Sequence, residues 1–190
     1  MDFIKERDIA NIKEILYMIG ENPERTGLLD TPERVTKMWK EIFRGYDESQ
    51  KPKITWFPNG QDGLTYDQMV IDQGYFYSQC EHHMIPFFGS YYFAYIPDKR
   101  VVGLSKVARV IDYYSAKLQV QERLVKEVLD ALESELVPAG IALVMKGRHL
   151  CKEMRGVKKH AGEMITSDIR GAFRKNLAAR EEFIRFINGK

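Results

Sequence analysis

Residues 90–96, Ser-Tyr-Tyr-Phe-Ala-Tyr-Ile, form the stretch that decides the fold. Aromatic residues dominate it, which predicts a β-strand. Side chains of a strand point alternately to its two faces, so Tyr91, Phe93 and Tyr95 should share one face and pack on a core. The strand therefore needs neighbouring strands and a layer of structure that covers this face.

Candidate neighbouring strands lie on both sides of this stretch. Short β-prone runs occur at residues 70–71 and 75–77, and a turn at residues 97–100 precedes another run at 101–104. The unbroken apolar run at residues 141–145 predicts a buried strand. We expect these pieces to form an antiparallel sheet.

The N-terminal third has helical periodicity. Apolar residues at helical spacing predict an amphipathic helix over residues 3–19, with Gly20 as its stop signal. Residues 30–32, Asp-Thr-Pro, are typical of a helix start, and this second helix should end near Gly45. Residues 46–66 predict a connection of limited order.

A longer helical pattern follows the central strands. It covers residues 105–136, with Ser105 as a predicted cap and a break near residues 118–120. The order of elements predicts an α+β fold with helices on one face of the sheet. We expect an N-terminal helical region and connection at residues 1–66 and a catalytic domain at residues 67–190.

Composition restricts the class of protein. The chain has 190 residues, of which 44% are hydrophobic and 29% charged, as is typical of a globular protein with one core. The formal net charge of +2 is too small to favour a nucleic-acid partner. No apolar run approaches the roughly 20 residues of a membrane helix, and the first residues lack the apolar core of a secretory signal. We expect a cytoplasmic protein without nucleic-acid or membrane partners.

Residues 80–83, Cys-Glu-His-His, are the first candidate for chemistry. Cys80 and His83 have the spacing and the ligand types of a zinc site. A buried cysteine beside two surface histidines would produce the same pattern. The chain has two cysteines, and a reducing compartment favours metal binding over a disulfide.

Cys151 is the natural third ligand. If residues 148–155 are extended, the period of two places four chemically active side chains on one face. These are His149, Cys151, Glu153 and Arg155. Two cysteines and one histidine leave the fourth zinc position open, which is the arrangement of a catalytic zinc.

A closed site is the alternative. His82 or His149 could supply a fourth ligand and make the zinc structural. Against this, His82 should point away from its neighbour His83 on an extended backbone, and His149 lies beside Cys151 in a position suited to proton transfer.

Other polar residues could bind an anionic nucleotide. Lys106 and Arg109 share one face near a helix N-terminus, and Arg155 could join them around a triphosphate. Gln121 and Glu122 have the donors and acceptors to hold a guanine edge. Taken alone, the helical pairs Lys106–Arg109 and Gln121–Glu122 are more often explained as ordinary solvated helix surface.

Several segments in this order resemble the GTP cyclohydrolase I family. The resemblance extends from residue 22 to the C-terminal helix, nearly the whole chain. The matching segments are residues 23–35, 80–83, 95–97, 103–106, 119–124, His149-x-Cys151 and 154–157.

The resemblance implies a hydrolase that acts on cyclic amidine C–N bonds. Its reaction opens the imidazole ring of GTP, releases carbon 8 as formate and closes a new ring in 7,8-dihydroneopterin triphosphate. This is the first step towards tetrahydrofolate and the one-carbon metabolism that depends on it. The alternatives are an enzyme of the same fold that acts on another purine or pterin, and a zinc-stabilised oligomer that binds nucleotide without turnover.

The resemblance also implies roles for individual residues. Zn²⁺ would be held by Cys80, His83 and Cys151, and would lower the pKa of water. His82 and His149 would transfer protons. The substrate-binding residues would be Ser105, Lys106, Arg109 and Arg155 at the triphosphate and Gln121 and Glu122 at the guanine edge.

The implied architecture is the tunnelling fold (T-fold). In it, antiparallel sheets from several subunits join into an oligomeric barrel with helices outside. The resemblance implies a homodecamer of two pentamers, with active sites at the subunit interfaces.

Overall fold

The structure is a computed structural model that describes residues 5–189. Seven α-helices, three short 3₁₀ helices and seven strands occur in these residues. In chain order they are α1 (Glu6–Met18), η1 (Thr26–Leu28), α2 (Thr31–Ile42), η2 (Arg44–Tyr46), η3 (Glu48–Gln50), β1 (Trp56–Pro58), β2 (Val70–Cys80), β3 (Pro86–Ile96), β4 (Arg100–Val102), α3 (Ser105–Ser115), β5 (Leu118–Gln119), α4 (Gln121–Leu136), β6 (Gly140–His149), α5 (Leu150–Glu153), β7 (Glu163–Gly171), α6 (Ala172–Lys175) and α7 (Leu177–Ile187).

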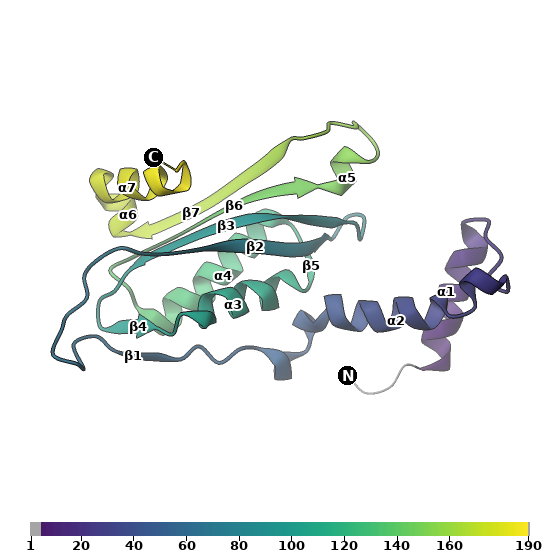
Figure 1. The fold of residues 1–190 in the computed structure, drawn as a ribbon, viewed down its shortest axis with the longest axis horizontal. Coiled ribbons are helices and arrows are strands. Elements are labelled where there is room, and N and C mark those ends of the chain that lie inside the picture. Colours follow the sequence, from purple (N-terminus) through teal and green to yellow (C-terminus); the bar gives the residue numbers. More distant parts are fainter. Residues whose placement is uncertain (1–4, 190) are drawn as a thin grey trace.

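A five-stranded sheet in the order β5-β2-β3-β6-β7 is the centre of the fold (Figure 1). The pairs β2–β3, β3–β6 and β6–β7 are antiparallel, which confirms that part of the prediction. The short β5 pairs parallel to the end of β2, so the sheet is mixed. The two β-prone runs at residues 70–71 and 75–77 belong to the single long strand β2.

One face of the sheet packs on α3 and α4. Tyr91, Phe93 and Tyr95 are buried on this face, as the alternation predicts. Fully buried residues of α4 such as Leu129 and Leu132 belong to the same core. The apolar stripe of α4 and the alternate positions of the strands therefore form one continuous apolar layer.

The opposite face is also covered at one end. Ala94, Ala142 and Val144 point to this face and pack with Phe173 of α6 and Phe183 of α7. The prediction that helices lie on one face only is wrong for these two elements (Figure 1). The physical reason is that β3 and β6 carry apolar residues on both faces here, so both faces need a cover.

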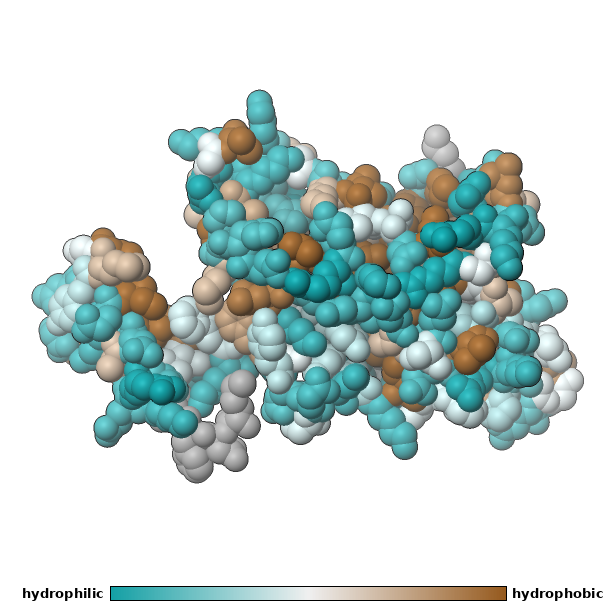
Figure 2. All heavy atoms as spheres, turned by 180° about the vertical axis from the view of Figure 1, so that it is seen from behind, coloured by the Kyte–Doolittle hydropathy of each residue, from teal (hydrophilic) through white to brown (hydrophobic). Residues whose placement is uncertain are grey.

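The helices α1 and α2 pack against each other and form an arm that projects away from the sheet (Figure 1). The helix predicted for residues 3–19 begins at Glu6 among the described residues, and residues 3 and 4 lie outside them. Helix α2 ends at Ile42, before the expected Gly45, which belongs to η2. Hydrophobic residues of this arm are visible at the surface, at its top and on the side that faces the rest of the molecule (Figure 2). The exposed apolar side chains include Ile15, Met18, Ile19 and Met38.

The helical pattern at residues 105–136 is broken at the predicted place. Strand β5 separates α3 from α4. The predicted cap at Ser105 is wrong by one residue: Leu104 occupies the cap position, and no side chain caps the helix.

The predicted domain limit after residue 66 stays a prediction, and β1 and β4 pair with each other across it.

None of the helices within residues 5–189 has both the length and the apolar character needed to cross a membrane.

Leu129→Ala should lower the free energy of unfolding by about 2–5 kcal/mol, because it opens a cavity in the fully buried face of α4. Urea denaturation at a fixed protein concentration measures this change. Leu177→Ala is the matched control, since Leu177 is 57% exposed, and it should change the free energy by about 0.5 kcal/mol or less. Equal effects of the two substitutions would contradict the assignment of the core.

Candidate active site

The turn between β2 and β3 presents the first two candidate metal ligands. Cys80 is the last residue of β2, and its main-chain N–H donates to the carbonyl of Ile85 at 2.9 Å. Its carbonyl accepts from the N–H of Met84 at 2.8 Å. Met84 has a φ of 54°, a left-handed conformation that closes the turn. The turn leaves Cys80 buried and exposes His83 beside it.

The third candidate ligand comes from the end of β6. The strand stops at His149, and Cys151 lies in the helical turn α5, so the prediction that residues 148–155 are extended is wrong. An ion pair between the half-exposed Arg148 and the buried Glu153 explains the difference. Arg148 donates to both carboxylate oxygens of Glu153, at 3.1 and 2.6 Å, which requires the chain to fold back. The hydrogen bond from Arg148 lowers the pKa of Glu153.

Cys80, His83 and Cys151 nevertheless come together. One ligand atom from each lies within 4.8 Å of the other two. Burial, and then the neighbouring sulfur of Cys80, raises the pKa of the Cys151 thiol. Two thiolates this close repel each other unless a cation lies between them. The group therefore fits a metal, and its sulfur and nitrogen donors suit zinc.

His82 lies next to this group without completing it. Its Nδ1 is 3.8 Å from the sulfur of Cys80, and its Nε2 is 3.8 Å from the carboxylate of Glu81. The side chain is 64% exposed. An exposed imidazole beside the metal group can exchange protons with solvent and with a bound molecule.

His149 occupies a more enclosed position. Its ring stacks on Phe87 with centroids 4.6 Å apart, and its Nε2 lies 3.0 Å from Oε1 of Gln121. Burial lowers the pKa of His149, while the charge of Glu122 acts in the opposite direction. The positive charge of Arg155 is close enough to favour the thiolate of Cys151. The predicted residues from α4 and from the segment after α5 thus lie around the metal group.

The three predicted residues of α3 lie elsewhere. The C-terminal end of α3 is near the metal group, because Ser115 accepts a hydrogen bond from Ser78 of β2 at 2.8 Å. Ser105 and Lys106 lie at the other end of this 11-residue helix, about 15 Å away at 1.5 Å per residue. Arg109 lies between the ends and lines a separate cavity of about 240 Å³ with Arg44. A single chain therefore does not bring these residues to the metal group.

Comparison with known proteins identifies the family. The family model described as GTP cyclohydrolase I matches residues 9–188. The chain belongs to this family. The resemblance found in the sequence is thereby confirmed.

Relatives from several bacteria, each named GTP cyclohydrolase 1, match most of the chain. The protein of Sulfurihydrogenibium sp. (strain YO3AOP1) is 48% identical over 93% of this chain and 91% of its own length. That of Caldanaerobacter subterraneus subsp. tengcongensis is 43% identical over 98% of both chains. That of Bartonella quintana is 43% identical over 94% of this chain and 86% of its own length.

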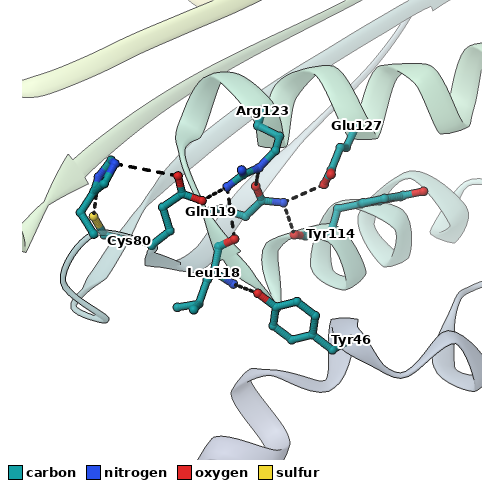
Figure 3. A network of polar contacts seen from close by, with 9 residues as sticks. Tyr46, Cys80, Tyr114, Leu118, Gln119, Arg123 and Glu127 are labelled. Carbon is teal, nitrogen blue, oxygen red and sulfur yellow. Dashed lines mark hydrogen bonds and ion pairs between the residues drawn. The ribbon is translucent and has the colours of Figure 1, made fainter.

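In this member of the GTP cyclohydrolase I family, a polar network connects the turn at residues 80–85 to α4 (Figure 3). This turn, which carries Cys80 and His83, is called the metal turn below. Glu81 forms an ion pair with Arg123, whose Nε donates to Oε1 of Gln119 at 2.9 Å. Gln119 in turn donates to Glu127 at 2.8 Å, and its carbonyl accepts from the N–H of Glu81 at 3.0 Å. The turn is therefore held by both main-chain and side-chain bonds.

Glu81 and Arg123 are the residues that sequence reasoning missed. Both lie inside the matched segments, and Glu81 had no predicted role. The signal was their opposite charge, but a spacing of 42 residues does not indicate which partner a carboxylate will meet. The sheet and α4 bring them together.

Arg123→Met should weaken metal binding about tenfold, because groups that orient a metal-binding segment typically contribute 10- to 100-fold to affinity. Competition with a chromophoric chelator measures the metal affinity. Arg34→Met is the matched control, since the ion pair of Arg34 with Asp30 is exposed and belongs to α2. An unchanged affinity in Arg123→Met would show that the network does not support the metal turn.

Proposed function

We propose that this chain is a zinc-dependent enzyme that hydrolyses GTP to 7,8-dihydroneopterin triphosphate and releases formate. The observation that carries the proposal is the Cys80–His83–Cys151 group with His149 beside it. This group lies in a chain that matches the GTP cyclohydrolase I family over residues 9–188. The relatives' shared name supports the same reaction.

The metal site supports the open, catalytic form of zinc. Cys80, His83 and Cys151 supply three ligands. His149 is not free to supply a fourth through Nε2, because this atom is hydrogen-bonded to Gln121. His82 is exposed and lies outside the close group. When bound, the metal supplies Lewis acidity that lowers the pKa of water.

Two histidines are placed to move protons. His149 serves as the acid and base at the imidazole nitrogen of the substrate: burial lowers the pKa of its ring, so the neutral imidazole can accept a proton and the imidazolium readily returns it. His82 exchanges protons at the exposed side of the metal group. Glu122, at the start of α4, accepts hydrogen bonds from the guanine edge.

A second copy of the chain completes the triphosphate site. Arg155 follows α5 and lies near Cys151, whereas Ser105, Lys106 and Arg109 lie on α3, away from it. A neighbouring subunit that places its own α3 beside this metal group would supply the missing cations. The active site would then lie at a subunit interface.

The surface of the chain supports such an assembly. The strand β7 forms one edge of the sheet, and most of β2 is unpaired on the side of the short β5. Open edges of long strands favour pairing with another copy. The exposed apolar side chains of the α1–α2 arm offer a further contact (Figure 2). We propose a T-fold barrel and a homodecamer of two pentamers.

Purified, zinc-loaded protein should convert GTP to equimolar formate and to a pterin that fluoresces after oxidation. Cys151→Ser should lose zinc and activity together, because it removes one of three ligands. Zinc is measured by elemental analysis. Binding of GTP without either product would favour the nucleotide-binding oligomer, and turnover of another purine alone would favour the related enzyme.

His149→Ala should keep stoichiometric zinc and lose turnover by about 10²- to 10⁴-fold, the usual contribution of a general acid or base. Elemental analysis and the pterin assay on the same preparation test both points. Loss of zinc in this variant would instead assign His149 as a fourth ligand and close the site.

Two inactive variants should restore activity when they share an oligomer. Lys106→Met removes a cation from α3, and Cys151→Ser removes a metal ligand, so each alone should be inactive. Co-assembly at equal amounts should restore roughly a quarter of the wild-type activity, if neighbouring subunits combine at random across a heterologous interface. Mixed oligomers without activity would show that each chain builds its own complete site.

A further inference from the structure

The buried side chain of Gln121 has an orientation that its neighbours determine. Its exposed fraction is 1%. Its Nε2 lies 3.0 Å from the carbonyl oxygens of Met145 and Met164 and from Oγ1 of Thr166. Main-chain carbonyl oxygens only accept hydrogen bonds, so the atom that faces them is the amide nitrogen. The amide oxygen must therefore face the other way.

That oxygen faces His149. Oε1 of Gln121 and Nε2 of His149 are 3.0 Å apart. An amide oxygen cannot donate, so Nε2 of the imidazole must carry a hydrogen. The neutral ring has one N–H group, which leaves Nδ1 with a free lone pair. In the imidazolium, Nε2 keeps its hydrogen, and the hydrogen that distinguishes the two forms is on Nδ1.

The packing around the pair leaves little freedom. The ring of His149 lies almost parallel to that of Phe87, at an interplanar angle of 7°. A β-carbon on Gly147 would lie only 2.3 Å from Oε1 of Gln121, so the amide has room because residue 147 is a glycine. Among the hydrogen bonds found within residues 5–189, none engages Nδ1 of His149.

We propose that Gln121 is a positioning residue that holds the neutral ring of His149 as its Nε2–H tautomer, with the free lone pair on Nδ1. The benefit for turnover rests on the proposed function, whereas the tautomer itself does not. This role differs from the predicted one at the guanine edge, because the donors of Gln121 are already engaged within the chain.

The wild-type protein alone tests the tautomer. Nitrogen-15 labelling of the histidine rings and two-bond proton–nitrogen correlation spectra distinguish the two neutral tautomers. The zinc-loaded protein without GTP should show His149 as the Nε2–H form. A spectrum of the Nδ1–H form would overturn the proposal, whatever the activity of the enzyme.

Gln121→Met tests whether the tautomer matters for turnover. The methionine keeps the size of the side chain and removes the acceptor, so His149 should show a mixture of tautomers. The kcat for GTP should fall about 10- to 100-fold, the usual cost of losing a partner that orients a histidine, while KM changes less than twofold. Gln68→Met, at an exposed glutamine, is the control and should change neither. A raised KM with an unchanged tautomer would overturn the proposal in favour of the guanine-edge role.

Gly147→Ala tests the same contact without altering either partner. The added methyl group displaces Oε1, so this variant should reproduce the tautomer mixture and the fall in kcat. An unchanged tautomer in both variants would show that Gln121 does not set it. A wild-type protein with the Nε2–H tautomer that makes no pterin would refute the proposed function and leave the role of Gln121 intact.

Discussion

The antiparallel pairing of β3 with β6 is the constraint on which the site depends. In its register Phe87, near the start of β3, pairs with His149 at the end of β6. The metal turn directly precedes β3, and Cys151 is the second residue after β6. Hydrogen bonding between the two strands therefore brings Cys80, His83 and Cys151 to the same end of the sheet. A slip of one residue would turn the side chains of β6 to the opposite face and separate the ligands.

Buried polar contacts connect this end of the sheet to α4. The short β5 runs beside Gln79 and Cys80, so that α4 begins next to the metal turn. Gln121 then bonds to β6, β7 and His149, while Gln119 and Arg123 hold the turn itself. Buried amides that satisfy all their hydrogen bonds stiffen a site, because any displacement leaves a polar group unpaired. The polar residues near the metal group thus fix one another's positions and also hold the candidate catalytic residues in place.

Within one chain, the predicted triphosphate-binding residues of α3 are separated from the metal group. Lys106 and Arg109 lie on α3, away from the metal group, and two strand edges of the sheet are open. An isolated subunit exposes these strand edges and the apolar side chains of the α1–α2 arm to solvent, which favours association. Association of copies would cover these surfaces and could bring the cations to a neighbouring metal group. Stability and catalysis would then depend on the same interfaces.

The types and spacing of neighbouring residues determine much of the secondary structure of this protein and its first candidate ligands. The alternation of Tyr91, Phe93 and Tyr95, the break near residues 118–120 and the pairing of Cys80 with His83 all follow from residue types and their spacing. Periodicity describes how side chains are arranged within one element, and these features lie within elements or directly beside them.

Only the tertiary structure determines which residues that are far apart in the sequence come into contact. Cys151 reaches the metal group from a helical turn rather than from an extended strand, because Glu153 folds back to Arg148. The partners of Glu81 and Gln121 lie 42 and 28 residues away. Spacing along the sequence contains no information about such contacts, since strand register and helix packing bring these residues together only when the chain folds.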